Sequence, residues 1–388
     1  MARALSKLVA SQGKATVRDL DAVDLHTHVY LPRYMEILRG RKDVPFVRPG
    51  IGGERLIILP AEQLQLEEQQ QQSTGSNAAG ISAGRPIGGE YWDATAKIRY
   101  MDRHGIRTSV LSLANPWLDF LPLEEQIRQA TLLNDDMETL CQDSDGRLLA
   151  FGVVPQDATT AVQEVQRVAS ELPHVRGVIL STAGLNGKGL DDPDMLEFYR
   201  EMDRTGLTIF LHPHYGVGNE HYGKYGHALF LALGFTFETT VAVSQLVLSG
   251  LLDQVPDTLR LLLAHSGGAL PFLAGRLDSC VDHDAAIAQN LQHAPSVYLK
   301  RFYYDAVAYH EPALQCLIDF VGSDKIVFGT DHPFFPPANN KTVEGEESED
   351  LSALDWRSTL SNYEIMANMS TEVQSAMLRD NAKRLLAI

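Results

Sequence analysis

The sequence predicts an α/β fold, a (β/α)8 barrel of the TIM type with loop insertions, on three observations. Apolar runs of strand length alternate with stretches of helix length along the 388 residues. Eight such runs occur, and strands that alternate with helices form a parallel sheet. Unusual polar residues directly follow these runs, as functional residues do at the carboxyl-terminal face of such a barrel. An open doubly wound sheet is the alternative, but no GxGxxG motif follows a strand.

The expected elements can be taken in chain order. The strands are expected at residues 24–28, 108–113, 148–153, 177–180, 207–211, 259–264, 302–306 and 325–328. The helices are expected at 91–104 (ended by Gly105), 123–142, 158–172, 193–204, 237–250, 269–288, 312–321, 356–366 and 371–378.

Two stretches interrupt this alternation. Residues 39–89 are a long polar excursion with a Glu/Gln-rich run at 67–72 and a Gly/Ser/Ala-rich piece at 73–84. Such composition lacks the apolar residues of a core, so we expect an inserted loop. The second stretch is an acidic loop at 336–355 that contains Glu344-Gly345-Glu346-Glu347. We expect the whole chain, residues 1–388, to form one barrel domain.

The composition is that of a globular enzyme, with 44% apolar residues, 21% charged residues and a net charge of −17. This charge disfavours nucleic acid and anionic membranes as partners. The first residues lack the apolar centre of a signal peptide, and no apolar run reaches the ~18 residues of a membrane span. Cys141, Cys280 and Cys316 are too few for a disulfide framework, so we expect a reduced, cytoplasmic location.

The stretch Asp24-Leu25-His26-Thr27-His28 places two histidines one residue apart at the end of the first strand. Side chains alternate along a strand, so both imidazoles point the same way and can hold one metal ion. Three later strands are followed by matching ligands, His212, His265 and Asp331. Neutral imidazoles and one carboxylate are typical ligands of a zinc ion that keeps one coordination position open for water or substrate. Iron and manganese accept the same types of ligand.

A single histidine at a strand end is usually a solvated or capping residue. Four histidines and one aspartate at the same end of four strands favour a metal site instead. His214, two residues beyond His212, is expected to be structural or to line the substrate site. Four other histidines are expected at the surface: His104, His174, His293 and His310.

The segments that carry these residues resemble a known family. They are His26-Thr27-His28, Leu211–His214, Ala264–Gly268 and Gly329–Phe334. They resemble the amidohydrolase superfamily and, within it, the non-oxidative decarboxylases of aminocarboxymuconate semialdehyde, γ-resorcylate and uracil-5-carboxylate (isoorotate). The similarity to the fungal isoorotate decarboxylases extends to residues 112–117, 187–193 and 264–276. The strand at 177–181 lacks the terminal lysine of many hydrolytic members, which favours a single metal ion.

The resemblance implies roles for individual residues. The implied metal ligands are His26, His28, His212 and Asp331, with zinc or another divalent ion as the metal. The implied catalytic residues are Asp331, which delivers a proton to the ring carbon, and His265, which orients or protonates the carboxylate. The implied substrate-binding residues are Arg85, Asn115, Arg276 and Phe334.

The resemblance implies a metal-dependent decarboxylase of a planar ring carboxylate, with 5-carboxyuracil as the leading substrate. A benzoate such as salicylate, a methylsalicylate or resorcylate is the alternative substrate. The alternative enzyme is a hydrolase of the same superfamily, a lactonase or a deaminase. A non-catalytic metal-binding scaffold is disfavoured by the complete ligand set. The resemblance also implies a homodimer, or a dimer of dimers, in which Arg276 acts in the neighbouring subunit's site.

Overall fold

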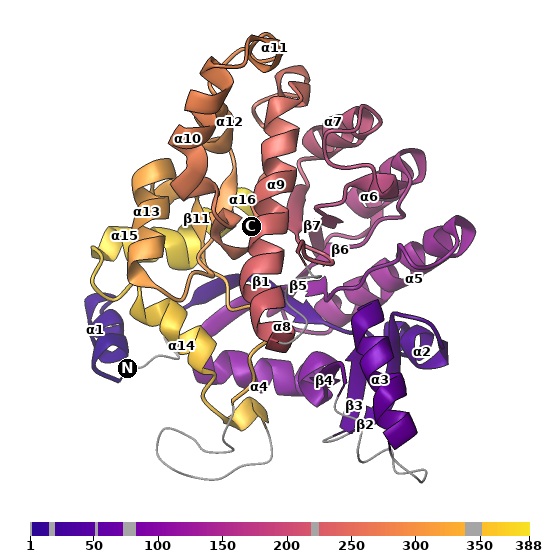
Figure 1. The fold of residues 1–388 in the computed structure, drawn as a ribbon. Coiled ribbons are helices and arrows are strands. Elements are labelled where there is room, and N and C mark those ends of the chain that lie inside the picture. Colours follow the sequence, from indigo (N-terminus) through magenta and orange to yellow (C-terminus); the bar gives the residue numbers. More distant parts are fainter. Residues whose placement is uncertain (1, 15–19, 51–52, 73–82, 219–224, 338–350) are drawn as a thin grey trace.

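Eight parallel strands form the barrel in the computed structural model, which describes residues 2–14, 20–50, 53–72, 83–218, 225–337 and 351–388 (Figure 1). In sheet order they are β1 (Ala22–Val29), β5 (Ile106–Leu113), β6 (Leu148–Gly152), β7 (Val175–Ser181), β8 (Thr208–His212), β9 (Leu261–Leu263), β10 (Tyr303–Asp305) and β11 (Ile326–Val327). Backbone hydrogen bonds from Leu25 to Phe328 (3.0 Å) and from Asp331 to His26 (2.8 Å) join the two edge strands. The predicted (β/α)8 barrel is confirmed.

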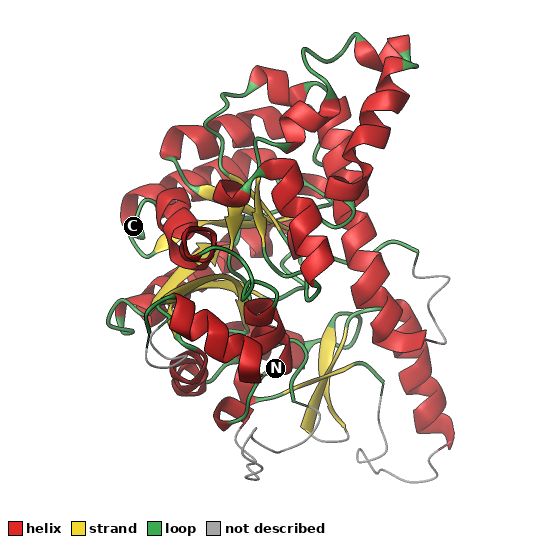
Figure 2. Ribbon diagram, turned by 90° about the vertical axis from the view of Figure 1, so that its left-hand side faces the viewer, coloured by secondary structure: helices red, strands yellow, loops and turns green. Residues whose placement is uncertain are grey.

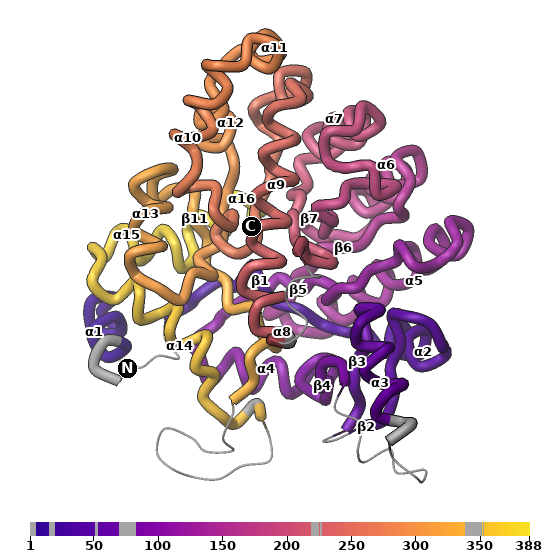
Figure 3. The backbone as a smooth tube through the Cα atoms, in the orientation of Figure 1, coloured from indigo at the N-terminus to yellow at the C-terminus, as the bar shows by residue number. Residues whose placement is uncertain are grey.

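Helices cover the outside of the barrel, as Figure 2 shows. Those that follow the strands are α4 (Ala94–His104), α5 (Leu123–Gln142), α6 (Ala158–Glu171), α7 (Met195–Thr205), α8 (Gly226–Leu229), α9 (Phe235–Leu248), α10 (Leu270–Asp282), α11 (Ala285–Ala288), α12 (Pro295–Leu299), α13 (Glu311–Val321), α14 (Arg357–Glu364), α15 (Thr371–Ser375) and α16 (Asn381–Leu386). The chain also has α1 (Ala2–Ser11) and α2 (Pro32–Gly40). In Figure 3, α1 lies beside the C-terminal helices, where Ser11 Oγ donates to Gln374 Oε1 (2.6 Å).

A π-helical turn joins α8 to α9, and the resulting helix is long and apolar. By length and composition alone, His227–Leu248 could cross a membrane, so the expectation that no apolar run reaches this length is wrong. Val243, Leu246 and Val247 on this helix pack in the barrel core. Within the helix, 44% of the most apolar 18-residue stretch is buried in the protein. One side of the helix therefore packs on the barrel, and apolar side chains also lie on its exposed side.

The inserted stretch is folded, so the prediction that residues 39–89 form a loop is wrong where the structure describes them. Three antiparallel strands and a helix form it: β2 (Phe46–Gly50), β3 (Gly53–Ile57), β4 (Arg85–Ile87) and α3 (Pro60–Gln72). Four apolar residues make its small core, Phe46, Ile57, Leu66 and Ala83. Glutamate and glutamine are good helix formers, so the run 67–72 continues α3. Residues 73–82, and 338–350 of the acidic loop, lie outside the described residues.

Candidate active site

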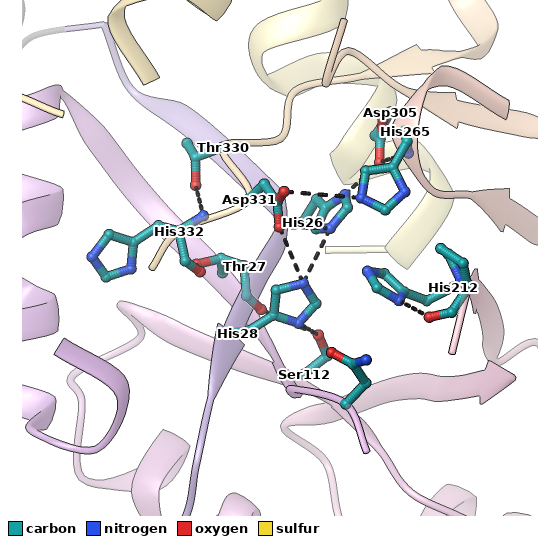
Figure 4. Close-up of polar contacts among 12 residues, drawn as sticks. His26, Thr27, His28, Ser112, His212, His265, Asp305, Thr330, Asp331 and His332 are labelled. Carbon is teal, nitrogen blue, oxygen red and sulfur yellow. Dashed lines mark hydrogen bonds and ion pairs between the residues drawn. The ribbon is translucent and has the colours of Figure 1, made fainter. Parts of the chain in front are cut away.

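Side chains from different strands converge at the carboxyl-terminal end of the barrel (Figure 4). His26 and His28 lie on β1, and their Nε2 atoms face each other at 3.1 Å, as the two-residue repeat predicts. Oδ1 of Asp331, after β11, lies 3.3 Å from Nε2 of His26 and 3.5 Å from Nε2 of His28. The ring centroid of His212, at the end of β8, lies 5.2 Å and 5.0 Å from those of His26 and His28. Nε2 of His265 lies 3.9 Å from Oδ2 of Asp331.

The opposite nitrogen of each of the first three imidazoles has a polar partner. Nδ1 of His26 bonds Oδ2 of Asp305 (2.5 Å), Nδ1 of His28 bonds Oγ of Ser112 (3.0 Å), and Nδ1 of His212 bonds the carbonyl oxygen of Pro213 (2.6 Å). These bonds fix the ring orientations and leave the Nε2 atoms for the centre of the cluster, which is the usual arrangement of histidines that bind a metal.

Asp331 and His265 reach the cluster from tight turns. Their φ angles are +58° and +53°, in the left-handed region that aspartate and histidine adopt more readily than most residues. Gly329 allows the turn to pass close to β1, because a Cβ at this position would lie 2.7 Å from the Cβ of His26. The local sequence Gly329-Thr330-Asp331 therefore places the carboxylate directly against the first strand.

The charges of the cluster act on one another. Burial disfavours a charge on His26, but the carboxylates of Asp331 and Asp305 outweigh it and raise the pKa of His26 to about 10. Burial also disfavours a charge on Asp331, but His26 outweighs this effect and holds the pKa of Asp331 well below its usual range. Burial lowers the pKa of His28 to about 4 and holds that of His212 well below its usual value. The anionic carboxylates of Asp331 and Asp305 thus stand beside a His26 that favours its protonated form, and His28 and His212 favour the neutral form. A bound metal ion would take the place of the His26 proton.

This donor set fits a divalent metal ion. The ligand atoms of His26, His28 and Asp331 lie within 4.8 Å of one another, and so do those of His26, His212 and His265. Nε2 of His212 is buried and has no hydrogen-bond partner among the described residues, so its lone pair can bind a metal. The structure therefore brings the four predicted ligands together and places His265 beside them.

A cavity of about 630 Å³ opens onto the cluster. His212, His265 and Asp331 line it together with Phe334, and most of its other walls are apolar. Phe334 is buried, and its ring meets that of His28 edge-on, with 5.4 Å between the centroids. The cavity therefore offers a planar molecule an aromatic wall next to the cluster.

Arg85, on β4 of the inserted sheet, brings positive charge to the same end of the barrel. Its guanidinium carbon lies 4.5 Å from the ring centroid of Phe334, and its Nη2 donates to the hydroxyl of Tyr30 (2.6 Å). Asn115, after β5, donates through Nδ2 to the carbonyl oxygen of His214 (2.8 Å). Within the described part of the chain, Nε of Arg85 and Oδ1 of Asn115 are buried without a hydrogen-bond partner, which suits both residues to bind a substrate.

Arg276 and His214 lie outside the cluster. Arg276 is exposed on α10, one turn after Phe272, and bonds none of the residues that the structure describes. It does not line the cavity of its own chain. The ring of His214 stacks on that of Trp117, with centroids 4.6 Å apart, and its Nε2 lies 3.0 Å from Oδ1 of Asp119. The contacts of His214 are therefore structural.

Comparison with known proteins identifies the family. A family model described as amidohydrolase matches residues 23–388, nearly the whole chain. The chain belongs to the amidohydrolase family. The solved structure of IDCase, an isoorotate decarboxylase from Metarhizium anisopliae, in its apo form is 39% identical to this amidohydrolase. It has a TM-score of 0.85, and the match covers 96% of this chain and 98% of the other.

Two further relatives are more distant. The 2-amino-3-carboxymuconate-6-semialdehyde decarboxylase of Dictyostelium discoideum is 27% identical over 253 residues, which are 64% of this chain and 69% of the relative. A dihydroxybenzoic acid decarboxylase from a Polaromonas species, solved with manganese and the inhibitor 2-nitroresorcinol, has the same fold. It is 20% identical, with a TM-score of 0.66 over 94% of this chain and 96% of its own. The resemblance to the amidohydrolase superfamily and its non-oxidative decarboxylases is confirmed.

Sequence reasoning missed Asp305, which organises much of the site in this amidohydrolase. It is fully buried at the end of β10 and accepts hydrogen bonds from the backbone N–H groups of His265 (2.9 Å) and Ser266 (2.8 Å), besides its bond to His26. The sequence pattern that could have identified Asp305 is the same as that of Asp331, a carboxylate at the end of an apolar run, here residues 302–306.

The expectation that His104 lies at the surface is wrong. The residue is buried, its Nδ1 donates to the carbonyl oxygen of Tyr100 (2.8 Å), and its Nε2 accepts from the backbone N–H of Trp356 (3.1 Å). Its position in the repeat 97, 100, 101, 104 on α4 indicated a buried face. His310, also expected at the surface, is exposed, which confirms that prediction, and it also lines the cavity.

Proposed function

We propose that the protein is a metal-dependent, non-oxidative decarboxylase of a planar ring carboxylate, which converts 5-carboxyuracil to uracil and CO₂. The proposal rests on the convergence of His26, His28 and Asp331 beside a cavity with an aromatic wall. The 39% identity to an isoorotate decarboxylase, over 96% of the chain, supports the pyrimidine substrate.

His26, His28, His212 and Asp331 would hold the ion. We propose zinc, and manganese, which is bound in the related dihydroxybenzoic acid decarboxylase, is the alternative. When bound, the ion supplies a Lewis acid and a template for the oxygens of the substrate. Both ions accept imidazole and carboxylate ligands, so the choice between them has to be measured.

The reaction needs a proton at one ring carbon. The bond between that carbon and the carboxylate breaks, its two electrons stay on the ring carbon, and one proton adds there as CO₂ leaves. We propose that Asp331, which faces the cavity, passes this proton to the ring carbon, while His265 lines the same cavity and can orient the leaving carboxylate. Arg85 offers the carboxylate a positive charge in a chain whose net charge is −17.

Two alternatives remain in view. A benzoate is the second candidate substrate, because a dihydroxybenzoic acid decarboxylase shares the fold. A lactonase or deaminase is less favoured, because β7 ends in Leu180-Ser181 and offers no lysine at the site where many hydrolytic relatives carry one.

A panel of ring carboxylates tests the reaction and the substrate together. The purified protein is incubated with 5-carboxyuracil, salicylate, 6-methylsalicylate and γ-resorcylate, and CO₂ and the ring products are measured by chromatography. We expect uracil to form. Release of CO₂ from a benzoate alone would overturn the pyrimidine assignment and keep the reaction class. An acid or ammonia without CO₂ would identify a hydrolase.

Elemental analysis tests the metal. We expect about one divalent ion per chain, as in single-ion sites with three or four protein ligands. A chelator should remove the ion and the activity together, and added Zn²⁺ or Mn²⁺ should restore both. Fully active protein without stoichiometric metal would contradict the proposal.

We propose further that two chains associate so that Arg276 of each chain completes the site of the other. Leu233, Phe237 and Val241 lie along one face of the α8–α9 helix and are 37%, 42% and 50% exposed. Phe272, on α10 at the cavity mouth, is 81% exposed. Exposed apolar side chains of this number are typical of an interaction surface. A second copy is the occupant that would also give the exposed Arg276 a partner.

A further inference from the structure

The side chain of Lys97 is buried in the protein interior. It lies on α4, which begins at Asp93, whose side chain accepts hydrogen bonds from two backbone N–H groups of the first turn. Lys97 falls on the buried face of this helix with Tyr100 and Met101. Among the residues whose burial the structure describes, it is the one lysine or arginine that is buried, with 6% of its surface exposed. A buried cation is costly unless its N–H groups are bonded.

The amine of Lys97 joins the two segments that carry the proposed metal ligands. Nζ donates to Oγ1 of Thr27, which lies between the two histidines of β1. It also bonds Nδ1 of His332 (2.8 Å), the residue after Asp331. Oγ1 of Thr27 in turn donates to the carbonyl oxygen of His332 (3.0 Å). Figure 4 shows Thr27 and His332 together beside the ligand cluster, so the amine closes a ring of three polar groups.

A buried carboxylate links the same two segments. Asp24 accepts hydrogen bonds from the hydroxyl (2.7 Å) and backbone N–H (3.1 Å) of Thr330 and from the backbone N–H of His26 (3.2 Å). Burial raises the pKa of Asp24 and lowers that of Lys97, and the charge of each opposes the effect of burial on the other. The two groups therefore form a buried pair next to the cluster.

Stability alone gives no reason for this lysine. Well-packed apolar side chains in place of both members of a buried ion pair are often neutral or stabilising. The bonds of Lys97 instead reach residues 70 and 235 positions away in the chain, both adjacent to predicted ligands. Polar groups that orient metal ligands in this way typically change metal affinity by about 10–100-fold.

We propose that Lys97 is a positioning residue, which holds β1 and the turn after β11 at the separation at which His26, His28 and Asp331 bind one metal ion. This inference rests on the proposed function, because it assumes that these residues are the ligands. Lys97 contacts neither the ion nor the substrate in this role and acts only through Thr27 and His332.

The test replaces Lys97 by methionine, which keeps an unbranched side chain and removes the N–H donors. Dissociation constants for Zn²⁺ and Mn²⁺ are measured by competition with a chromophoric chelator, and folding is followed by urea denaturation. We expect Lys97→Met to bind both ions about 10–100-fold more weakly and to lower kcat. Its unfolding midpoint should also fall, because the buried carboxylate of Asp24 loses its partner. Met101→Ala is the matched control: it removes packing from the same buried face, so it should lower the midpoint and leave metal affinity unchanged.

The outcomes separate this inference from the proposed function. If Lys97→Met binds metal as tightly as the wild type, the positioning role is wrong while the proposed metal centre stands. If the wild type binds neither ion, the proposed function itself fails and the inference fails with it. If Lys97→Met does not fold, Thr27→Val, which removes the hydroxyl bonded by the lysine, takes its place. Wild-type affinity in that variant would equally overturn the positioning role.

Discussion

At the scale of single residues, the two roles proposed for Asp331 make opposite demands. As a ligand it has to be a carboxylate, and the imidazole of His26 holds its pKa well below the usual range. As an acid it has to carry a proton next to the substrate. We expect Asp331→Asn to lower kcat about 10²–10⁴-fold even in preparations that retain metal, the usual scale for the loss of a general acid. Stopped assays on variants of known metal content measure this. A near-normal kcat in metal-loaded Asp331→Asn would assign the proton to His265.

His104 gives the protein a defined acid sensitivity. Burial disfavours the charged ring and lowers its pKa to about 4 from 6.5. The neutral ring can accept the hydrogen bond from Trp356 through Nε2. The unfolded chain therefore binds this proton more readily than the folded one. The contribution is complete above pH 6.5 and is lost as the pH falls toward 4. We expect about 2 kcal/mol of unfolding free energy to be lost from this group between about pH 7 and pH 5.

Urea denaturation of the wild type and of His104→Gln at the two pH values measures this loss. Glutamine can keep a donor and an acceptor but does not titrate, so its stability should change less between the two values. An equal pH dependence in both proteins would show that other groups cause the acid sensitivity.

At the scale of elements, the inserted sheet is a small unit with its own core, and it carries Arg85 to the site. Ile57 is fully buried there. We expect Ile57→Ala, a change that typically costs 2–5 kcal/mol in a core, to open β2, β3 and β4 while the barrel stays folded. Hydrogen exchange should accelerate at 46–57 and 85–87, and kcat/KM should fall with unchanged metal content. Leu64→Ala, at a position on α3 that is 61% exposed, is the control and should change neither quantity. Uniform exchange throughout the barrel would contradict the local character of the unit.

At the scale of the whole molecule, the proposal that Arg276 acts in the partner's site leads to a complementation test. Arg276→Ala and Asp331→Asn should each be inactive alone. In a mixed dimer, the chain with intact Asp331 receives an intact Arg276 from its partner, so we expect one working site per dimer and about half of the wild-type kcat. Light scattering establishes the oligomeric state, and two affinity tags isolate the mixed dimer. Isolated mixed dimers as inactive as either parent would show that Arg276 does not act across the interface.

The sequence by itself determined the barrel and the four histidines and one aspartate of the ligand cluster. The alternation of strand and helix runs, the pair His26 and His28, and the polar residues after later strands were sufficient, because the ends of parallel strands share one face of a barrel. These are local patterns with a fixed period. They specify which side of an element a residue occupies, and therefore which residues share the site.

Only the tertiary structure decided how those residues are held. Asp305 and Lys97 act on ligands far away in sequence, and Lys97 and His332 are 235 positions apart. The inserted sheet forms because a few scattered apolar residues meet, although its average composition is polar. The cost of burying Lys97 or protonating His104 depends on partners that the fold brings from other segments, and no local period encodes those partners.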